Sequence, residues 1–321
     1  MPAPPARVAI LDDYQQVALA CGPWDTLAGR VEVSAVADHI ADDDELVARL
    51  AGCAVVVAMR ERTPFPRARL ERLGDLRLLV TTGRANAAID LDAARELGIV
   101  VCGTDGLAAP TAELTWALIL AVTRHVCAED RSIREGGWQH TIGPELEGRT
   151  LGVVGLGRQG RRVAAIGRAF GMRVIAWSQN LRAEDAAAHG VEAVGREELL
   201  AQADVVTIHL RLSDRTRGLI GADELAAMKP SAYLVNTSRG PIVDEAALLH
   251  ALHAGVIAGA ALDVYDIEPL PAGHPLRRAP NTVLTPHLGY VSTGSYDVFF
   301  AGVVAAIAGW LDGAPVAVLN G

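Results

Sequence analysis

The chain has few cysteines and no excess of positive charge, and each shortage narrows its possible functions. Its four cysteines form no CxxC pair, so we expect buried thiols in a reducing compartment and no metal site. The formal net charge is -9 and the pI is near 5.5. A nucleic-acid partner requires a basic face, so we expect none.

The sequence also lacks a long apolar run. The longest, Phe299–Leu311, is shorter than the ~20 residues that a membrane-spanning helix needs. Met1–Arg7 leads directly into strand-like residues, without the apolar core and cleavage site of a signal peptide. We therefore expect a cytoplasmic protein with no membrane partner.

What the chain does have is a regular alternation of short β-branched runs with helical patterns, which is typical of parallel sheets built from βαβ units. In the first part of the chain the expected strands are Val8–Leu11, Val55–Ala58, Leu76–Thr81 and Ile99–Cys102. In the second part they are Leu151–Val154, Arg173–Trp177, Val205–Leu210, Ala232–Val235, Ala258–Leu262 and Thr282–Leu284. This second set is enough for one complete doubly wound sheet.

Two apolar helices frame the second set of strands. Thr111–His125 is apolar on nearly all sides, with Thr111 as the expected N-cap, so it must be buried on several sides, and a dimer interface would bury it. A last helix, Ser295–Leu311, is placed to fold back on the first strands. The pattern predicts an α/β protein of two Rossmann-like doubly wound domains. A dinucleotide-binding domain, 103–290, is inserted into a flavodoxin-like substrate domain, 1–102 and 291–321.

A glycine fingerprint for dinucleotide phosphates follows the first strand of the second set. Gly155 permits a tight turn, Gly157 lets the backbone approach a pyrophosphate, and Gly160 allows close packing of helix on strand. The helix that begins here offers unpaired N–H groups and a partial positive charge to phosphates. We expect the fingerprint, with Arg158 and Gln159 inside it, to bind NAD or NADP.

The next strand leaves the choice between the two cofactors open. It ends at Ser178, where a site selective for NAD places an acid on the ribose hydroxyls. Ser178 carries no charge to repel a 2′-phosphate, and Arg182 follows four residues later. Selectivity that comes from other residues is equally compatible with this loop.

Polar residues follow the last three expected strands, where ligands bind in doubly wound sheets. They are Arg239, Glu268 and His287. Reduction of a 2-oxo acid leaves an alkoxide that needs a proton, which a histidine can supply near neutral pH. A carboxylate beside it, Glu268, would fix the tautomer and stabilise the imidazolium. The fork of Arg239 suits a substrate carboxylate. We predict these three as the catalytic residues.

With these segments in view, the chain resembles the D-isomer-specific 2-hydroxyacid dehydrogenases over about Val8–Leu319. The resemblance is carried by the glycine fingerprint and by the segments Val235–Gly240, Ala261–Pro269 and Thr285–His287. It implies an NAD(P)-dependent oxidoreductase acting on a small 2-oxo or 2-hydroxy acid, as a homodimer joined through the cofactor domain. It adds Thr237 and Asp263 to the cofactor site, Asp263 on the nicotinamide carboxamide, and a loop at Thr82-Gly83 whose backbone binds the substrate carboxylate.

The substrate loop departs from the family pattern. It reads Gly83-Arg84-Ala85-Asn86 where the family commonly has Gly-Val-Gly. Arg84, together with Arg60 and Arg62, could bind a phosphate or second carboxylate of the substrate. Alternatively, Arg84 forms a salt bridge with Glu61 or Asp90, the interpretation we favour.

Two other functions are compatible with this scaffold. Formate dehydrogenases of this fold resemble a pattern with Gln at the acid position, so Glu268 argues against that activity. A dinucleotide-sensing binding protein, such as a corepressor that looks like these dehydrogenases, can keep the catalytic residues. Turnover of 2-oxo acids separates an enzyme from such a sensor.

Overall fold

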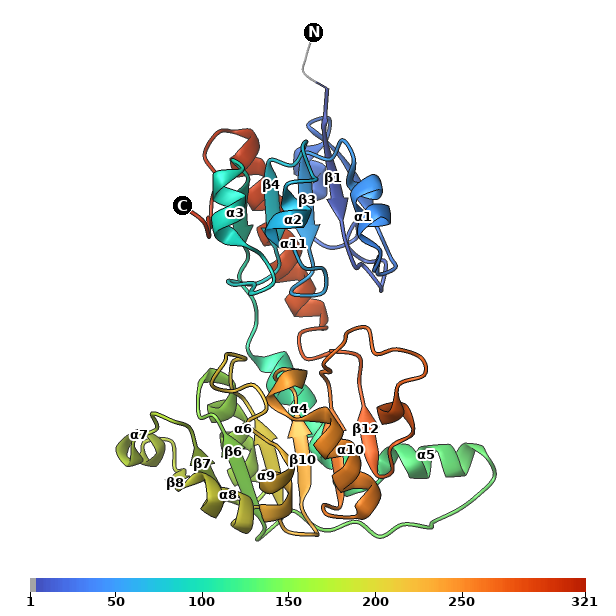
Figure 1. Ribbon diagram of the computed structural model, residues 1–321, viewed down its shortest axis with the longest axis vertical. Helices are drawn as coiled ribbons and strands as arrows, with labels where there is room; N and C mark the ends of the chain where they lie inside the picture. Colours follow the sequence, from blue (N-terminus) through green and yellow to red (C-terminus); the bar gives the residue numbers. More distant parts are fainter. Residues whose placement is uncertain (1–3) are drawn as a thin grey trace. The chain divides into compact units, whose positions relative to one another are not determined.

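The computed structural model describes residues 4–321 of the chain; the first residues of the N-terminal segment, for which we expect no signal peptide, lie outside it. The chain divides into two compact units, Met1–Leu107 with Ser292–Gly321, and Ala108–Val291 (Figure 1). The second unit is thus inserted into the first.

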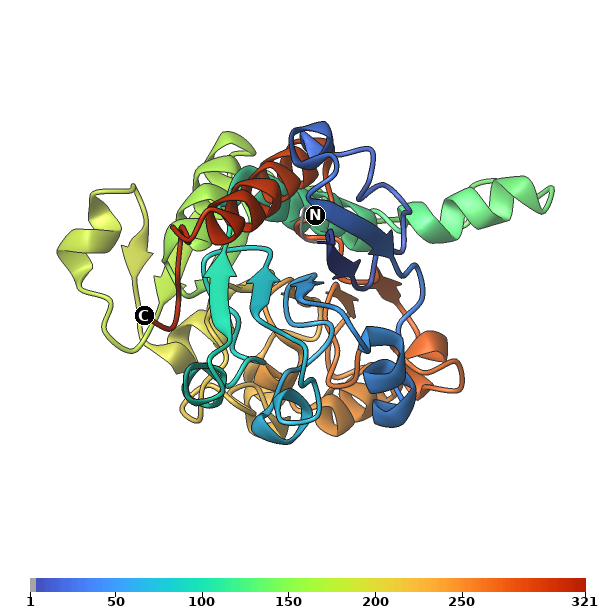
Figure 2. The ribbon, with the colours of Figure 1, turned by 90° about the horizontal axis from the view of Figure 1, so that it is seen from above.

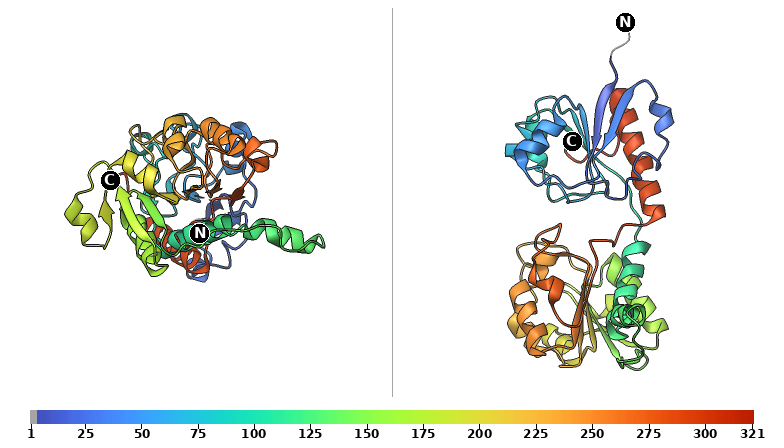
Figure 3. Two further views of the ribbon diagram at one scale, coloured as in Figure 1. Left: turned by 90° about the horizontal axis from the view of Figure 1, so that it is seen from below. Right: turned by 90° about the vertical axis from the view of Figure 1, so that its right-hand side faces the viewer.

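The first unit is built on a parallel five-stranded sheet in the order β2-β1-β3-β4-β5, which is the flavodoxin-like order. Helices α1, α2 and α3 cover one face of this sheet, and α11 covers the other (Figure 3, right). The strands are β1 (Ala6–Ile10), β2 (Val31–Ala35), β3 (Val55–Ala58), β4 (Leu78–Thr81) and β5 (Val100–Gly103), and the helices are η1 (Trp24–Leu27), α1 (Asp43–Leu50), α2 (Arg67–Leu70), α3 (Leu91–Glu96) and α11 (Thr293–Leu311).

Helix α11 requires a correction to the sequence argument about membranes. It has 19 residues and is long and apolar enough, by length and composition alone, to cross a membrane. The apolar run Phe299–Leu311 underestimated the length of this helix, because the helix begins at Thr293. The side chain of Ser292 caps it. Phe299, Phe300 and Val303 of this helix are buried, and it packs against β4 and β5. We interpret it as a core helix of the first unit.

The second unit is built on a parallel seven-stranded sheet in the order β12-β11-β10-β9-β6-β7-β8. This order is that of a Rossmann sheet with one added edge strand. Six of its strands coincide closely with the expected segments. The bounds are β6 (Thr150–Val154), β7 (Arg173–Trp177), β8 (Glu192–Ala193), β9 (Val205–Ile208), β10 (Tyr233–Asn236), β11 (Gly259–Leu262) and β12 (Thr282–Leu284).

The sequence prediction missed one edge strand in each sheet. Strand β2 has the alternating sequence VEVSA and is only partly buried, and β8 has two residues. A strand at the edge of a sheet needs neither a continuous apolar run nor great length. Periodicity alone therefore gives little signal for either strand.

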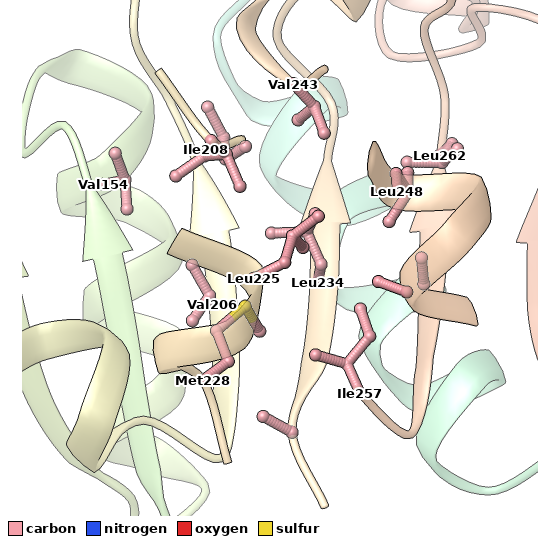
Figure 4. Close-up of a cluster of buried hydrophobic side chains, with 14 of the residues drawn as sticks. Val154, Val206, Ile208, Leu225, Met228, Leu234, Val243, Leu248, Ile257 and Leu262 are labelled. Carbon is pink, nitrogen blue, oxygen red and sulfur yellow. The ribbon is translucent and has the colours of Figure 1, made fainter. Parts of the chain in front are cut away.

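Helices cover both faces of the second sheet. On one face lie α8, α9 and α10, and their apolar residues pack against Val206, Leu234 and Leu262 of the strands (Figure 4). On the other face lie α4 and α6. The helices of this unit are α4 (Ala109–Thr123), α5 (Val126–Arg134), α6 (Arg158–Ala169), α7 (Ala183–Ala187), α8 (Arg196–Gln202), α9 (Ala222–Ala227), α10 (Glu245–Ala254), η2 (Gly240–Ile242) and η3 (Pro275–Arg278).

Helix α4 is the nearly all-apolar helix expected from the sequence, but its beginning was predicted wrongly. It starts at Ala109, with Pro110 in the first turn, and no side chain caps it. Pro110 lacks an N–H that would need a cap. Thr111 lies inside the helix, and its hydroxyl donates to the carbonyl oxygen of Gly289 at 2.8 Å, thereby tying the helix to the loop after β12.

Candidate active site

The glycine fingerprint forms the tight turn between β6 and α6. Gly155 has a φ of +101°, which favours glycine, and a Cβ there would lie 2.7 Å from the carbonyl oxygen of His209. A Cβ at Gly160 would overlap the carbonyl oxygen of Gly155. Both positions therefore exclude a larger side chain for reasons internal to the turn.

Gly157 differs, because a Cβ at this position would meet no atom within 4 Å. The space in front of the α6 N-terminus is thus open, as a bound pyrophosphate requires. Nearby, Gln159 Oε1 is buried and has no hydrogen-bond partner among the described residues, while Arg158 is exposed. These features fit a dinucleotide phosphate held by this turn.

Gly157 permits a test of that fit. Its φ of -80° and ψ of -160° are accessible to alanine, so we expect Gly157→Ala to keep the parent's melting temperature. The added methyl group would occupy the space of the pyrophosphate, and we expect the dissociation constant for NADH or NADPH to rise about tenfold or more. Fluorescence titration measures it.

Gly195 provides a matched control. It is also the N-cap of a helix in the second unit, and a Cβ there would also meet nothing within 4 Å. Gly195→Ala should leave cofactor affinity unchanged. Equal affinities for the two variants and the parent would mean that the pyrophosphate does not lie at the β6–α6 turn.

At the carboxyl end of β7, the structure makes Arg182 a poor candidate for a 2′-phosphate ligand. Its guanidinium pairs with Glu184 at 2.7 Å and with Asp185 at 2.9 Å. Those carboxylates would compete with, and repel, a phosphate. Ser178 remains an uncharged residue at the strand end, so neither residue decides between NAD and NADP.

The loops that carry the predicted catalytic residues follow neighbouring strands. Arg239 comes after β10, Glu268 after β11 and His287 after β12, and these strands are adjacent and parallel. The loops touch one another through Tyr265. A Cβ at Gly240 would overlap the Tyr265 backbone, and the Tyr265 hydroxyl donates to the Thr285 carbonyl oxygen at 3.0 Å.

Glu268 and His287 form a direct pair. Glu268 Oε2 lies 2.6 Å from Nδ1 of His287, and its other oxygen accepts from the backbone N–H of Tyr265 at 2.9 Å. Both side chains are mostly buried, with 25% and 17% exposed. A carboxylate on Nδ1 holds the proton there and leaves Nε2 for a substrate. Tyr290 packs edge-on against the ring, with centroids 5.5 Å apart.

Asp263 holds the backbone of the His287 loop. Its fully buried carboxylate accepts from the Thr285 hydroxyl at 2.6 Å and from the N–H groups of Leu288 and Gly289 at 2.7 and 2.9 Å. His287 sits between these bonds with a φ of +55°, which is unfavourable for a residue with a Cβ. Burial raises the pKa of Asp263, while the bond from Thr285 opposes this shift.

Another histidine, His209, follows strand β9 but is unsuited to supply a proton. Its Nε2 lies 3.0 Å from the Thr207 hydroxyl. Desolvation lowers the pKa of His209 to about 4, so its ring is neutral at pH 7. His287 differs from His209 in having a carboxylate on one ring nitrogen.

Two further predicted residues are fixed by their neighbours. The Asn236 side chain donates to the Arg239 carbonyl oxygen at 2.9 Å, and Arg239 Nη1 donates to the Ser238 carbonyl oxygen at 2.7 Å. The hydroxyl of Thr237 is buried against that of Thr115 on α4, at 2.8 Å. The cofactor-side loop after β10 is thus anchored on both sides.

In the first unit, the predicted substrate loop follows β4. The N–H of Thr82 donates to the Ala58 carbonyl oxygen and that of Gly83 to the Thr104 hydroxyl, at 3.1 and 2.8 Å. The N–H groups of Arg84 and Ala85, in contrast, have no acceptor among the described residues. Those two are therefore among the donors that this loop offers to an anion.

The expected salt bridge of Arg84 was assigned to the wrong partner. Arg84 pairs with Asp105 at 2.7 Å, and both side chains are well exposed, at 80% and 69%. Asp105 lies on the segment after β5, which only the tertiary structure brings beside the loop. The partner of Arg84 is therefore Asp105, in place of the expected Glu61 or Asp90. Glu61 instead lies 3.7 Å from Arg60.

Taken together, a glycine fingerprint at the α6 N-terminus and a paired histidine after β12, four strands along the sheet from β6, are the architecture of a dinucleotide-dependent dehydrogenase. Residues 116–289 match the family model described as "D-isomer specific 2-hydroxyacid dehydrogenase, NAD binding domain".

Several relatives agree with this match. A glyoxylate reductase from Aeropyrum pernix is 49% identical over 62% of this chain and 62% of its own length. A D-3-phosphoglycerate dehydrogenase from Archaeoglobus fulgidus is 40% identical over 72% of this chain, which spans 45% of that protein. Among solved structures, a phosphoglycerate oxidoreductase from Vibrio cholerae has a TM-score of 0.92 and 37% identity, covering 96% of this chain and all of its own.

The chain belongs to the D-isomer-specific 2-hydroxyacid dehydrogenase family. This confirms the predicted family, the fold class of two Rossmann-like domains and the nicotinamide dinucleotide as cofactor. The predicted reaction class, oxidoreduction of 2-oxo and 2-hydroxy acids, is the one that the description of the family names. The aligned part covers less than two thirds of some curated relatives' length.

Proposed function

We propose that this chain reduces a small 2-oxo acid to the D-2-hydroxy acid, or catalyses the reverse reaction, with Arg239, Glu268 and His287 as catalytic residues. The observation that carries the proposal is the 2.6 Å contact between Glu268 Oε2 and His287 Nδ1. This pair leaves one imidazole nitrogen for proton exchange with a substrate oxygen. A bound nicotinamide would supply the hydride chemistry.

The proton is handled by His287. In reduction, Nε2 donates a proton to the oxygen of the substrate carbonyl as negative charge develops there. The ring is an imidazolium before this step, and the Glu268 carboxylate stabilises that charge. In oxidation the neutral Nε2 accepts the hydroxyl proton. Asp263 supports the same residue, because it holds the loop that gives His287 its left-handed backbone.

In this proposal, the carboxylate of the substrate is bound by arginine side chains and by backbone N–H groups. The Arg239 guanidinium can pair with the substrate carboxylate and polarise the carbonyl group. The N–H groups of Arg84 and Ala85, in the loop after Thr82 and Gly83, suit a carboxylate as well. Arg60 lies at this loop, with Nη1 donating to the Thr82 carbonyl oxygen at 3.1 Å. We assign the cofactor phosphates to Gly155, Gly157, Arg158, Gln159 and Gly160, and the remainder of the cofactor to Ser178, Thr237 and Asp263.

The test is turnover of a panel of 2-oxo acids with NADH and NADPH in parallel. We expect reduction of at least one small acid of the panel, which includes glyoxylate, hydroxypyruvate and phosphohydroxypyruvate. Preference for the phosphorylated acid would assign Arg60, Arg62 or Arg84 to the phosphate. Cofactor binding without turnover of any acid would favour a dinucleotide-sensing protein instead.

We also propose a homodimer joined through the second unit, in the cytoplasm. Helix α5 and the segment after it project from that unit (Figure 2) and expose Val126, Ile133, Trp138 and Ile142. Such a concentration of exposed apolar side chains is typical of a protein interface. Four free cysteines, two of them buried, suit a reducing compartment.

A further inference from the structure

Arg60, just after β3, has an unusual backbone conformation. Its φ is +55°, in the left-handed region that residues with a Cβ rarely adopt. Such a conformation persists only where the surrounding structure determines it, and it is often associated with function. The surroundings of Arg60 therefore need an explanation.

Two side chains bracket the Arg60 backbone, one on each side of its Cα. The N–H of Arg60 donates to the Thr82 hydroxyl at 3.0 Å. Its carbonyl oxygen accepts from Asn86 Nδ2 at 2.6 Å. Because the two peptide groups that define φ and ψ are both held, the left-handed conformation is fixed by the substrate loop itself.

Asn86 is well suited to this task because every part of its amide is used. The second N–H of Nδ2 donates to the Thr81 hydroxyl at 2.9 Å, and Oδ1 accepts from the N–H of Ala88 at 2.9 Å. The residue is only 6% exposed. A buried amide whose two N–H groups and oxygen are each bonded has one orientation, so it acts as a rigid link between Arg60 and the loop.

The consequence is the position of the Arg60 guanidinium. It lies against Gly83, where a Cβ would overlap Nη1, and Nη1 donates to the Thr82 carbonyl oxygen at 3.1 Å. The charged group is thus held against Thr82 and Gly83, the first residues of the predicted substrate loop. In an ordinary conformation of residue 60 the side chain would leave its Cα in a different direction.

We propose that Asn86 is a positioning residue for substrate binding: it locks Arg60 in the left-handed conformation and so places the guanidinium at the carboxylate-binding loop. This inference rests on the proposed function for the role of Arg60 in binding the acid. Asn86 itself does not touch the substrate. Its effect therefore passes entirely through Arg60, and that makes it measurable.

The experiment is a double-mutant cycle with glyoxylate as substrate. Asn86→Ala should raise the KM for glyoxylate about tenfold, the size expected for losing one well-placed hydrogen bond to a charged group, with kcat and cofactor affinity little changed. Arg60→Ala should raise it at least as much. Adding Asn86→Ala to Arg60→Ala should then change KM no further, because coupled residues are not additive.

Asn320 serves as the matched control in the same unit. It is 7% exposed, donates to the Ile99 carbonyl oxygen at 2.8 Å and accepts from the N–H of Val101 at 2.9 Å. Asn320→Ala should lower the melting temperature about as much as Asn86→Ala while leaving the KM for glyoxylate unchanged. A rise in KM for both variants would mean general loosening of the unit and would overturn the proposal.

Two other outcomes would also contradict the positioning role of Asn86. A further outcome would contradict the proposed function alone. Independent effects of Asn86→Ala and Arg60→Ala on KM would mean that Asn86 does not act through Arg60. If the parent reduces no 2-oxo acid of the panel, the proposed function fails. A crystal structure of Asn86→Ala then decides the positioning role: an Arg60 φ that stays near +55° refutes it, and relaxation to a negative φ supports it.

Discussion

Replacing His287 with alanine is expected to lower turnover of a 2-oxo acid by about 10²-fold or more, the usual contribution of a general acid. Without the imidazole, the developing alkoxide must take its proton from water. Cofactor affinity should stay within about twofold, because the side chain serves the substrate and not the dinucleotide phosphates. Steady-state kinetics and fluorescence titration of NADH measure the two effects separately.

His253→Ala is the control for this variant. His253 is exposed on α10, away from the strand ends that carry the predicted site. Its removal should change neither turnover nor cofactor affinity. If His287→Ala turned over the acid as fast as the parent, another group would be the proton donor and the Glu268–His287 pair would have no catalytic role.

The change Glu268→Gln is expected to lower kcat by about 10² or more, by analogy with the effect of an amide at the carboxylate of a catalytic triad. Glutamine keeps the size and shape of the side chain. Its Oε1 can still accept from the N–H of Tyr265, in which case the NH₂ group faces His287 Nδ1.

An amide N–H at Nδ1 changes the protonation pattern of the ring. Nδ1 must then accept a hydrogen bond, so the ring proton moves to Nε2. The imidazolium, which needs an acceptor at both nitrogens, is disfavoured, and reduction slows. The neutral ring now has its proton on the nitrogen that should accept one, and oxidation slows as well. Measurement of kcat in both directions tests this, and a variant slow in only one direction would contradict the tautomer argument.

A second glutamate–histidine pair in the same unit supplies the control. Glu245 Oε1 lies 2.9 Å from His274 Nε2, and these side chains are 21% and 17% exposed, much as in the predicted catalytic pair. Glu245 lies in the first turn of α10. Glu245→Gln should leave kcat unchanged in both directions, so that a loss confined to Glu268→Gln reflects the site and not the removal of a buried charge.

Periodicity predicted most of the fold because buried parallel strands are written in the sequence as short β-branched runs. Segments such as Val55–Ala58 and Arg173–Trp177 coincide with β3 and β7. The start of α4 was predicted wrongly, since Pro110 and Thr111 are both acceptable in a first turn. The helix begins at Ala109, and the hydroxyl of Thr111 bonds to the loop after β12 instead of capping the helix.

The residues of the candidate site also divide into those that a local sequence pattern reveals and those that it does not. Gly155, Gly157 and Gly160 are recognisable because their spacing alone sets the turn between a strand and a helix. The positioning residues Asn86 and Asp263 have no such local pattern. Asn86 could only be noted as part of an unusual loop, because its partner Arg60 lies 26 residues earlier in the chain. The same holds for Asp105 as the partner of Arg84.

By itself the sequence determined the class of fold, the glycine-rich turn between β6 and α6 and the identity of the residues at the strand ends, because these depend on periodicity and on short-range spacing. Only the tertiary structure decided how those residues are paired and aimed. Segments distant in sequence are joined by the 2.6 Å contact of Glu268 with His287 and by the three bonds to Asp263. Bonds between such segments also hold the left-handed backbones of His287 and Arg60. Hydrogen bonds between such segments require the strands to be aligned, and no local pattern encodes their geometry.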